Sequence, residues 1–519
     1  MGIPFYFRKI TTQIQGVVQP TPPAEGIHRL FLDFNGVVHN AAAKVGKTSG
    51  ASTTIASFER DVLRATIAAT EAIVAFAKPS ALVYLGVDGV APMAKIAQQR
   101  RRRHLSHFLK RQDGYDAPKY EWDSNAISPG TAFMRKLRDG LHTHFVSASK
   151  SSSGPRFVLS ADDEAGEGEH KIIRYIDHHP TPDGCFDAVH GLDADLIMLS
   201  MLARKRDIVL MREPQHFRGA KSDNVHPYLF LQVDPLRRAV VDRYGVDIPS
   251  YVFACVLAGN DFLPAASFCS IKRNDIDLIM MFVAKLDTPL VSADEAGRWS
   301  VSHSALEDLL GALAAEEDTR FEQAHREYFT ASTKNLRQKQ DRTEFYGICN
   351  KNPRYEDLMR DGCWRRGYYV RLFGMSASGD DMVNEVCTEY LNGLRWVCDY
   401  YYNQSTDSAW FYPYNYSPTL VDLHNMLQTL DDIDADLALP PPMHVDPELQ
   451  LLMILPVQSV SLLPKHLRWL MRENSPISYM YPVDFRLETY LKTRLHECIP
   501  RIPVVQPSDV AQHYLNSTS

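Results

Sequence analysis

Short apolar runs alternate with amphipathic segments along roughly the first 290 residues of the chain. The run "HRLFLD" ends at Asp33, "ALVYLGVD" ends at Asp88, and "YVFACVLAGND" ends at Asp261. Two more runs, "RFVLS" and "FDAVH", are each followed by an acidic turn that contains Gly and then by a helical pattern. Strands and helices that alternate in this way are typical of a mostly parallel sheet covered by helices. The pattern therefore predicts an α/β domain over residues 1–290.

The rest of the chain has a different pattern. From about Asp287 to Thr343 it is charged and helical, and we expect residues 291–343 to be a helical connector. Beyond it, residues 344–519 are rich in aromatic side chains, as in "YLNGLRWVCDYYYNQ" and "SAWFYPYNYSP". These residues are predicted to form a second, mainly helical region that packs against the first.

Seven acidic residues of the first region share one position in this pattern. Each lies at or just beyond the end of an apolar run, in a turn that contains Gly or Asn: Asp33, Asp88, Glu167, Glu169, Asp193, Asp195 and Asp261. Because the ends of parallel strands meet at one edge of the sheet, these carboxylates should lie together and raise one another's pKa. Divalent cations relieve such repulsion, and ligand sets made only of oxygen favour Mg²⁺ or Mn²⁺. Two such ions about 3.5–4 Å apart can activate a water and stabilise the leaving oxygen of a phosphodiester.

Each acidic residue alone has a simpler interpretation. An Asp that follows a strand is more often a helix cap or a turn residue than a metal ligand, and the "DAD" of residues 193–195 could cap a helix that begins near Leu196. Five acidic turns in one α/β region are harder to explain by capping, so the set favours a metal site.

A basic run, "KIAQQRRRR", follows Asp88 by seven residues, and Pro92 before it suits the first turn of a helix. Four residues of the run fall within an arc of about 100° on that helix: Lys95, Gln99, Arg102 and Arg103. Arg100 and Arg101 point elsewhere. Two guanidinium groups, an ammonium and an amide on one face suit a terminal phosphate held beside the acidic edge. The alternative, a solvated or nuclear-import run, explains the arginines but not the lysine and glutamine on their face.

The composition excludes several classes of protein. A net charge of −7 implies no general affinity for polyanions, so nucleic acid would have to bind at local patches. Eight cysteines without a CxxC pair argue against a disulfide framework or a zinc module. The apolar runs are too short to span a bilayer, and "MGIPFYF" has no signal-peptide pattern. We therefore expect an intracellular protein that is neither secreted nor in a membrane, without a choice between nucleus and cytoplasm.

Eight motifs of the first region occur in the order found in one family. They are "MGIPFYFRKI", "FLDFNGVVHN", "GVDGVAPMAKIAQQRRRR", "EWDSNAISPGTAFM", "AGEGEHKIIRYI", "GLDADLIMLSM", "REP" and "AGNDFLPA". Through them the chain resembles the 5′→3′ exoribonucleases of the XRN type, and "YLNGLRWVCDYYY", "WFYPYNYSP" and "SPISYMYPVDF" match the family's second conserved region. The resemblance covers nearly the whole chain. After Phe485 the sequence diverges, and we expect a short form without the long C-terminal extension.

The resemblance implies roles for individual residues. The seven carboxylates take the catalytic, metal-binding positions for two Mg²⁺ ions, with Mn²⁺ as a substitute, and the four residues of the basic face take the 5′-phosphate pocket. His39 matches a histidine that stacks on an RNA base, and Asn35 lies beside it in the substrate site. Trp410 is the better match to the family's stacking tryptophan and Trp396 the weaker one. Core packing is the alternative for either ring.

The family also implies a fold and a reaction. The fold is a PIN/FEN-like nuclease core whose active site the second region encloses, so that only a single strand enters. The reaction is processive hydrolysis of single-stranded RNA from a 5′-monophosphate end, in RNA decay or processing, and it releases nucleoside 5′-monophosphates. The catalytic unit is expected to be monomeric, and the sequence identifies no protein partner. Two alternatives stay open: a catalytically weak RNA-binding scaffold, and a 5′ nuclease that cuts DNA or flap structures.

Overall fold

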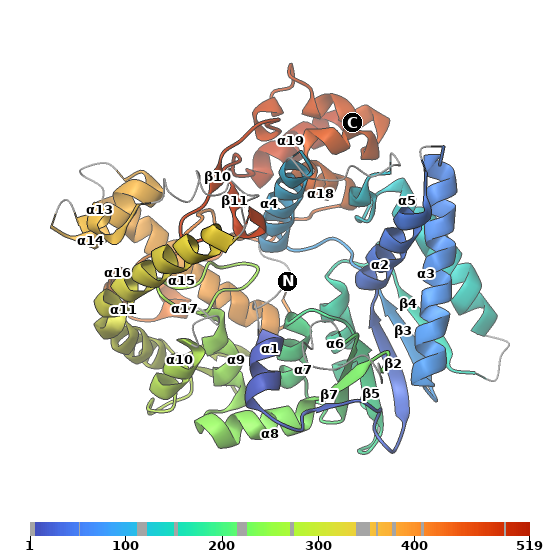
Figure 1. Ribbon diagram of the computed structural model, residues 1–519, viewed down its shortest axis with the longest axis horizontal. Coiled ribbons are helices and arrows are strands. Elements are labelled where there is room, and N and C mark those ends of the chain that lie inside the picture. The colour runs from blue at the N-terminus through green and yellow to red at the C-terminus, as the bar shows by residue number, and fades with distance from the viewer. Residues whose placement is uncertain are drawn as a thin grey trace.

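A computed structural model gives the structure of the protein (Figure 1). It describes residues 6–50, 52–111, 122–149, 154–214, 226–269, 275–338, 353–359, 362–375, 380–405, 409–492 and 495–518. Parts of four sequence features lie outside these ranges. They are residues 1–5 of the N-terminal motif, Glu121 of "EWDSNAISPGTAFM", residues 339–352 at the junction of the expected connector and second region, and Ser408 of "SAWFYPYNYSP".

The first region is built on a seven-stranded sheet. In the spatial order β1-β7-β6-β5-β2-β3-β4, the five strands from β6 to β4 are parallel, and β7 and β1 extend one edge in antiparallel pairing. The strands are β1 (Val18–Gln19), β2 (Ile27–Asp33), β3 (Leu82–Gly86), β4 (Arg156–Ser160), β5 (Phe186–His190), β6 (Ile208–Arg212) and β7 (Leu229–Gln232). The carboxyl ends of β5, β2, β3 and β4 are therefore neighbours.

Helices cover both faces of this sheet, because successive strand residues point to opposite sides. On β3, Val83 and Leu85 enter the core beneath α2 (Phe34–Thr48), α3 (Ile55–Ala77) and α5 (Ala132–Leu141). Leu82 and Tyr84 enter a second core on the other face. The helices that contribute to this second core include α1 (Tyr6–Gln13), α6 (Gly168–His178), α7 (Asp195–Leu202), α8 (Val233–Tyr244) and α9 (Ile248–Val256).

The chain after α9 is mainly helical, through the end of the first region, the expected connector and the second region. Its helices in the described ranges are α10 (Asp275–Val283), α11 (His303–Gln338), α13 (Tyr355–Leu358), α14 (Trp364–Tyr368), α15 (Asp380–Tyr402), α16 (Leu420–Leu427), α17 (Ile433–Asp436), α18 (Pro447–Ile454) and α19 (Pro507–Thr518). Two hairpins accompany them: β8 (Val291–Ala293) with β9 (Trp299–Val301), and β10 (Leu487–Glu488) with β11 (Ile499–Pro500). Leu309 of α11 and Trp396 of α15 are buried in the same core as Leu199 of α7. The expected connector thus contributes to the core, and its boundaries stay a prediction.

The apolar run that ends before Asp261 forms a helix, and the sequence pattern assigned it wrongly to a strand. Asp247 accepts a hydrogen bond from the Ser250 N–H at 2.8 Å and caps α9, with Pro249 in its first turn. A short continuous apolar run does not distinguish a buried strand from a buried helix, because both are surrounded by apolar side chains. Asp261 therefore reaches the site from the end of a helix.

Helix α4 (Met93–Lys110) joins the two regions, and Figure 1 shows it beside α18 in the C-terminal part of the chain. Met93 and Ile96 are buried against Leu451 and Ile454 of α18. Together with the shared core, this packing confirms the predicted fold: a mostly parallel sheet flanked by helices, with a mainly helical second region packed against it. No helix in the described ranges has both the length and the hydropathy that crossing a membrane would require.

Candidate active site

A cavity of about 470 Å³ lies where the four neighbouring strands end. Eleven of the fourteen residues predicted for the site line it: Asp33, Asn35, His39, Asp88, Lys95, Gln99, Arg102, Arg103, Glu167, Glu169 and Asp193. Asp261 adjoins them, since its Oδ2 atom lies 2.9 Å from Lys95 Nζ. Asp195 lies close enough to Asp193 and Asp261 for their charges to interact. Trp410 does not line the cavity.

These carboxylates lie at or just after the ends of strands, as the sequence pattern predicts. Asp33 is the last residue of β2, and Asp88 follows the end of β3 by two residues. Glu167 and Glu169 lie at the start of α6, which follows β4. The "DAD" segment, residues 193–195, connects β5 to α7. Residues far apart in the sequence thus meet at one edge of the sheet.

Glycines allow α6 to approach β3 closely. A Cβ on Gly168 would lie 2.5 Å from the carbonyl oxygen of Gly86 and 3.4 Å from Asp33 Oδ1. Only a residue without a side chain can bring the start of α6, with Glu167 and Glu169, this near to the end of β2.

A Gly168→Ala substitution is expected to lower stability and metal binding together. The added Cβ would meet backbone rather than a flexible side chain, so α6 must shift, and overpacking of this kind costs about 1–3 kcal/mol in the free energy of unfolding. Thermal denaturation with and without Mn²⁺ measures both effects. Gly50→Ala is the control, because its Cβ would meet nothing within 4 Å. A wild-type melting temperature and Mn²⁺ response for Gly168→Ala would contradict this expectation.

Asp88 also has the capping role that the simpler interpretation assigned to it. Its Oδ1 accepts a hydrogen bond from the Gly168 N–H at 2.8 Å, in the first turn of α6. Its Oδ2 accepts one from Asn35 Nδ2 at 2.8 Å, and the Asp88 N–H donates back to Asn35 Oδ1. Asp88 thus caps a different helix from the one that follows it, and Asn35 holds this carboxylate in place.

Burial and mutual repulsion hold several of the carboxyls close to neutral. Burial first, and then the surrounding carboxylates, raise the pKa of Asp33 to about 8 and that of Asp195 to about 8. The same causes raise the pKa of Glu169 well above its usual range. Asp261 differs: burial raises its pKa, but nearby positive charges, that of Lys95 foremost, together outweigh burial and lower the pKa to about 2. The acidic edge therefore favours a cation.

The residues present fit divalent cations. Asp195 Oδ1 is buried and, among the described residues, accepts no hydrogen bond. Glu167, Glu169 and His170 each offer a ligand atom, and these atoms lie within 4.8 Å of one another. The other candidate ligands are carboxylate oxygens, the donors that Mg²⁺ and Mn²⁺ prefer.

Lys95 lies against the acidic residues as well as on the basic face of α4. Its Nζ atom is 2.5 Å from Glu167 Oε2 and 2.9 Å from Asp261 Oδ2, and the side chain is buried. The sequence grouped Lys95 with the phosphate-binding residues, whereas the structure pairs its charge with two carboxylates. Lys95 therefore connects the basic face to the acidic edge.

The arginines of α4 divide as the helical spacing predicts. Arg102 and Arg103 line the cavity. Arg100 donates to the carbonyl oxygens of Met453, at 3.1 Å, and Met480 in the second region. Arg101 donates to the carbonyl oxygen of Tyr412 at 3.3 Å. The run is thus not one continuous basic patch.

Arg103 is buried, and no carboxylate of the described residues is in hydrogen-bond contact with it. Its Nη1 donates to Ser128 Oγ at 2.8 Å and to Asn125 Oδ1 at 3.2 Å, and its Nε has no partner among the described residues. Burial, with the nearby charge of Arg102, lowers the pKa of Arg103 to about 9, so the guanidinium is still charged at pH 7. A buried cation whose partners are neutral is a favourable site for an anion such as phosphate.

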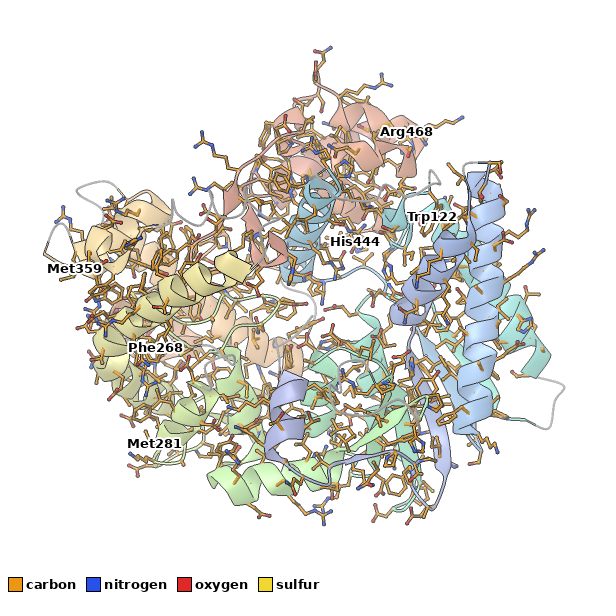
Figure 2. The ribbon with its side chains drawn as sticks, viewed as in Figure 1. Trp122, Phe268, Met281, Met359, His444 and Arg468 are labelled. Atoms are coloured by element: carbon orange, nitrogen blue, oxygen red, sulfur yellow. The ribbon has the colours of Figure 1, made fainter. Side chains whose placement is uncertain are left out.

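The pattern of residue types alone does not identify the two partners of Arg103. Asn125 and Ser128 lie in the motif "EWDSNAISPGTAFM", whose only signal in the sequence is its match to the family. Trp122 of this motif, labelled in Figure 2, packs against Phe58 and Phe133 with ring centroids 4.9 and 5.5 Å apart. This packing fixes the segment that holds Arg103.

His39 lies on α2 and faces the cavity. Desolvation there, and then the charges of Arg102 and Arg103, lower the pKa of His39 to about 4. The ring is therefore neutral at pH 7 and can stack on a base without adding charge. Its stacking role stays a prediction.

Trp410 lies in the hydrophobic core, whereas the family resemblance implied that its ring stacks on an RNA base. It is 2% exposed, its Nε1 donates to Glu389 Oε2 at 2.9 Å, and its ring lies 5.5 Å from that of Trp396. Trp396 is 1% exposed as well. The structure agrees with the core-packing alternative for both rings, since neither is open to a base in this conformation.

A Trp410→Ala substitution is therefore expected to act on stability. Removal of a buried Trp costs about 3–5 kcal/mol in the free energy of unfolding, because a cavity is left behind. Chemical denaturation measures this loss, and single-strand binding at a temperature where the variant stays folded should change little. A stable variant that binds a single strand much more weakly would instead restore the stacking role.

The second region contacts the acidic edge but contributes no residue to those found to line the cavity. Every residue found to line the cavity lies before residue 214. A side chain of α15 nevertheless contacts the acidic edge, since the Tyr400 hydroxyl donates to Glu167 Oε1. The sequence pattern alone does not identify Tyr400, which lies within the aromatic motif "YLNGLRWVCDYYY".

Two family models match the chain. "XRN 5'-3' exonuclease N-terminus" matches residues 1–214, and "Xrn1 helical domain" matches residues 300–514. The chain is 28% identical to "5'-3' exoribonuclease 1" of Homo sapiens, over 97% of this chain and 33% of that protein. It is 24% identical to "5'-3' exoribonuclease 1" of Schizosaccharomyces pombe, over 97% of this chain and 48% of that protein. The chain thus spans between a third and a half of the length of these relatives.

A solved structure is similar only in part. "Crystal Structure of T5 D15 Protein Co-crystallized with Metal Ions" aligns with 57% of this chain and 86% of its own, at 9% sequence identity. The TM-score is 0.27, which is too low to bear on the fold.

Proposed function

The chain belongs to the XRN family of 5′-3′ exoribonucleases, and from this membership we propose that it degrades single-stranded RNA from a 5′-monophosphate end. It removes one nucleotide at a time and releases nucleoside 5′-monophosphates. The cation is Mg²⁺, which Mn²⁺ can replace, and the catalytic unit is a monomer.

The main observation behind this proposal is that acidic and basic side chains line the same cavity. The acidic edge formed by the strand ends lies beside the basic face of α4. Lys95 contacts the acidic edge, and Arg103 lies eight residues later on the same helix, about 12 Å along its axis. A 5′-phosphate on Arg102 and Arg103 would leave the first phosphodiester bond of the strand near the carboxylates. This arrangement favours cleavage counted from the 5′ end.

Each set of residues has its own part in the reaction. Bound divalent cations supply a water of lowered pKa and charge compensation at the leaving oxygen. The seven carboxylates hold the cations, and Asn35 fixes the orientation of Asp88. Arg102 and Arg103 hold the 5′-phosphate. His39 stacks on a base, and because every base has a π-face this contact does not select a sequence.

Single-stranded RNA labelled at either end tests the direction of cleavage. With Mg²⁺, a 5′ label should appear at once as a mononucleotide, while a 3′ label should stay on progressively shorter strands. Early release of the 3′ label, or of internal fragments, would contradict the proposal. Preferred cutting of a DNA flap would favour the flap-nuclease alternative, and binding without product would favour an RNA-binding scaffold.

A further inference from the structure

Three successive tyrosines at the end of α15 attach the second region to the first. The Tyr400 hydroxyl donates to Glu167 Oε1 at 2.5 Å. The Tyr401 ring lies 5.9 Å from the ring of His170, measured between centroids. The Tyr402 hydroxyl donates to the carbonyl oxygen of Pro249 at 2.7 Å. The first of the three therefore contacts a carboxylate of the acidic edge, whereas the hydroxyl of the third donates to a backbone carbonyl.

Glu167 is held from two sides. Its Oε2 atom lies 2.5 Å from Lys95 Nζ, and its Oε1 atom accepts the hydrogen bond from Tyr400. Lys95 belongs to α4 of the first region and Tyr400 to α15 of the second. The orientation of this carboxylate thus depends on the packing of the two regions against each other.

The Tyr400 ring has little freedom to move. It lies 3.9 Å from the ring of His170, 4.8 Å from that of Trp396 and 5.4 Å from that of Phe262, measured between ring centroids. Tyr400 is 1% exposed. His170 directly follows Glu169, and Phe262 directly follows Asp261. The motifs that supply carboxylates therefore also supply the rings that fix the tyrosine.

We propose that Tyr400 is a positioning residue for the divalent cations: its hydroxyl holds Glu167 in the orientation in which this carboxylate binds metal. Groups that hydrogen-bond metal ligands typically contribute 10- to 100-fold to metal affinity, because they fix the ligand before the metal arrives. The second region is then required for metal binding as well as for folding. The inference rests on the proposed metal-dependent function.

Tyr402 supplies a matched control. It directly follows Tyr401 on the same helix, and its hydroxyl also crosses to the first region. Its acceptor is the backbone at the start of α9, not a carboxylate. Tyr402→Phe therefore removes an equivalent contact between the regions without touching the acidic edge.

The experiment compares the full chain with Tyr400→Phe and Tyr402→Phe, each free of RNA. Calorimetric titration with Mn²⁺ gives the affinity for metal, and thermal denaturation without metal gives the stability. Tyr400→Phe should bind Mn²⁺ about 10- to 100-fold more weakly than the wild type. Tyr402→Phe should bind it as the wild type does, whatever its melting temperature.

The outcomes separate this inference from the proposed function. A wild-type chain that binds no Mn²⁺ would refute the metal-dependent function itself. A wild-type chain that binds Mn²⁺, with both variants of the same affinity as the wild type, would overturn the inference alone. Equal losses of affinity in both variants would also overturn it, because the tyrosines would then act only through the packing of the two regions.

Discussion

Replacement of Asp195 by asparagine should abolish RNA hydrolysis while the protein stays folded. Asp195 is 1% exposed, and its Oδ1 accepts no hydrogen bond among the described residues, so this oxygen stabilises the fold through no hydrogen bond. Asparagine has nearly the same shape but removes a negative charge from a group of repelling carboxylates. Because hydrolysis by this mechanism depends on bound cations, the rate should fall by several orders of magnitude. The melting temperature of the metal-free protein should be equal or higher.

Asp187 on β5 supplies the contrasting control. It is fully buried, and its Oδ2 lies 2.5 Å from Arg29 Nη2 in an ion pair away from the cavity. Loss of one partner from a buried ion pair costs about 3–5 kcal/mol. Asp187→Asn should therefore destabilise the protein but leave the rate intact at temperatures where it is folded. An Asp195→Asn variant that hydrolyses RNA at a rate near that of the wild type would remove Asp195 from the metal site.

Replacement of Arg103 by alanine should erase the preference for a 5′-monophosphate over a 5′-hydroxyl end. A hydrogen bond to a charged group contributes about 1.5–3 kcal/mol, which corresponds to roughly 10- to 150-fold in kcat/KM. The loss should fall on monophosphate RNA, because a 5′-hydroxyl end has no phosphate for the guanidinium to bind. The ratio of the two kcat/KM values, measured on strands of one sequence, gives the effect directly.

Arg101→Ala is the matched control for this substitution. Its guanidinium donates to the Tyr412 carbonyl in the second region and does not line the cavity. The preference for monophosphate ends should therefore survive in Arg101→Ala. Arg100 is a poorer control, because its bonds to Met453 and Met480 anchor the second region. If Arg101→Ala and Arg103→Ala lose the preference equally, the run binds phosphate as a diffuse patch and the division of α4 into faces is irrelevant.

The parts of the site that follow from local periodicity could be predicted from the sequence. Asp33 and Asp88 follow strands because apolar runs end there, and the parallel sheet brings them together. The division of α4 depends only on helical geometry, so Arg103 could be separated from Arg100 without a structure. The carboxylates and the basic face come together in the cavity for these reasons.

The parts that depend on tertiary packing could not be predicted in this way. The run before Asp261 is apolar on all sides whether it forms a strand or a buried helix, so periodicity could not identify α9. An aromatic motif does not tell whether Trp410 faces a cavity or a core, since both need an apolar ring. The contact of Tyr400 with Glu167 joins residues 233 positions apart and depends on how α15 packs against α6. The family resemblance marked these motifs but not their contacts.

The most direct test of the central claim is the release of mononucleotides from 5′-monophosphate RNA. The claim is that the acidic edge and the basic face act as one cation-dependent site that starts at a 5′-phosphate. With Mg²⁺ the enzyme should release nucleoside 5′-monophosphates from this RNA rapidly and from 5′-hydroxyl RNA slowly, and EDTA should stop both reactions. Undiminished release in EDTA, or equal rates on the two RNAs with Mg²⁺, would contradict the account.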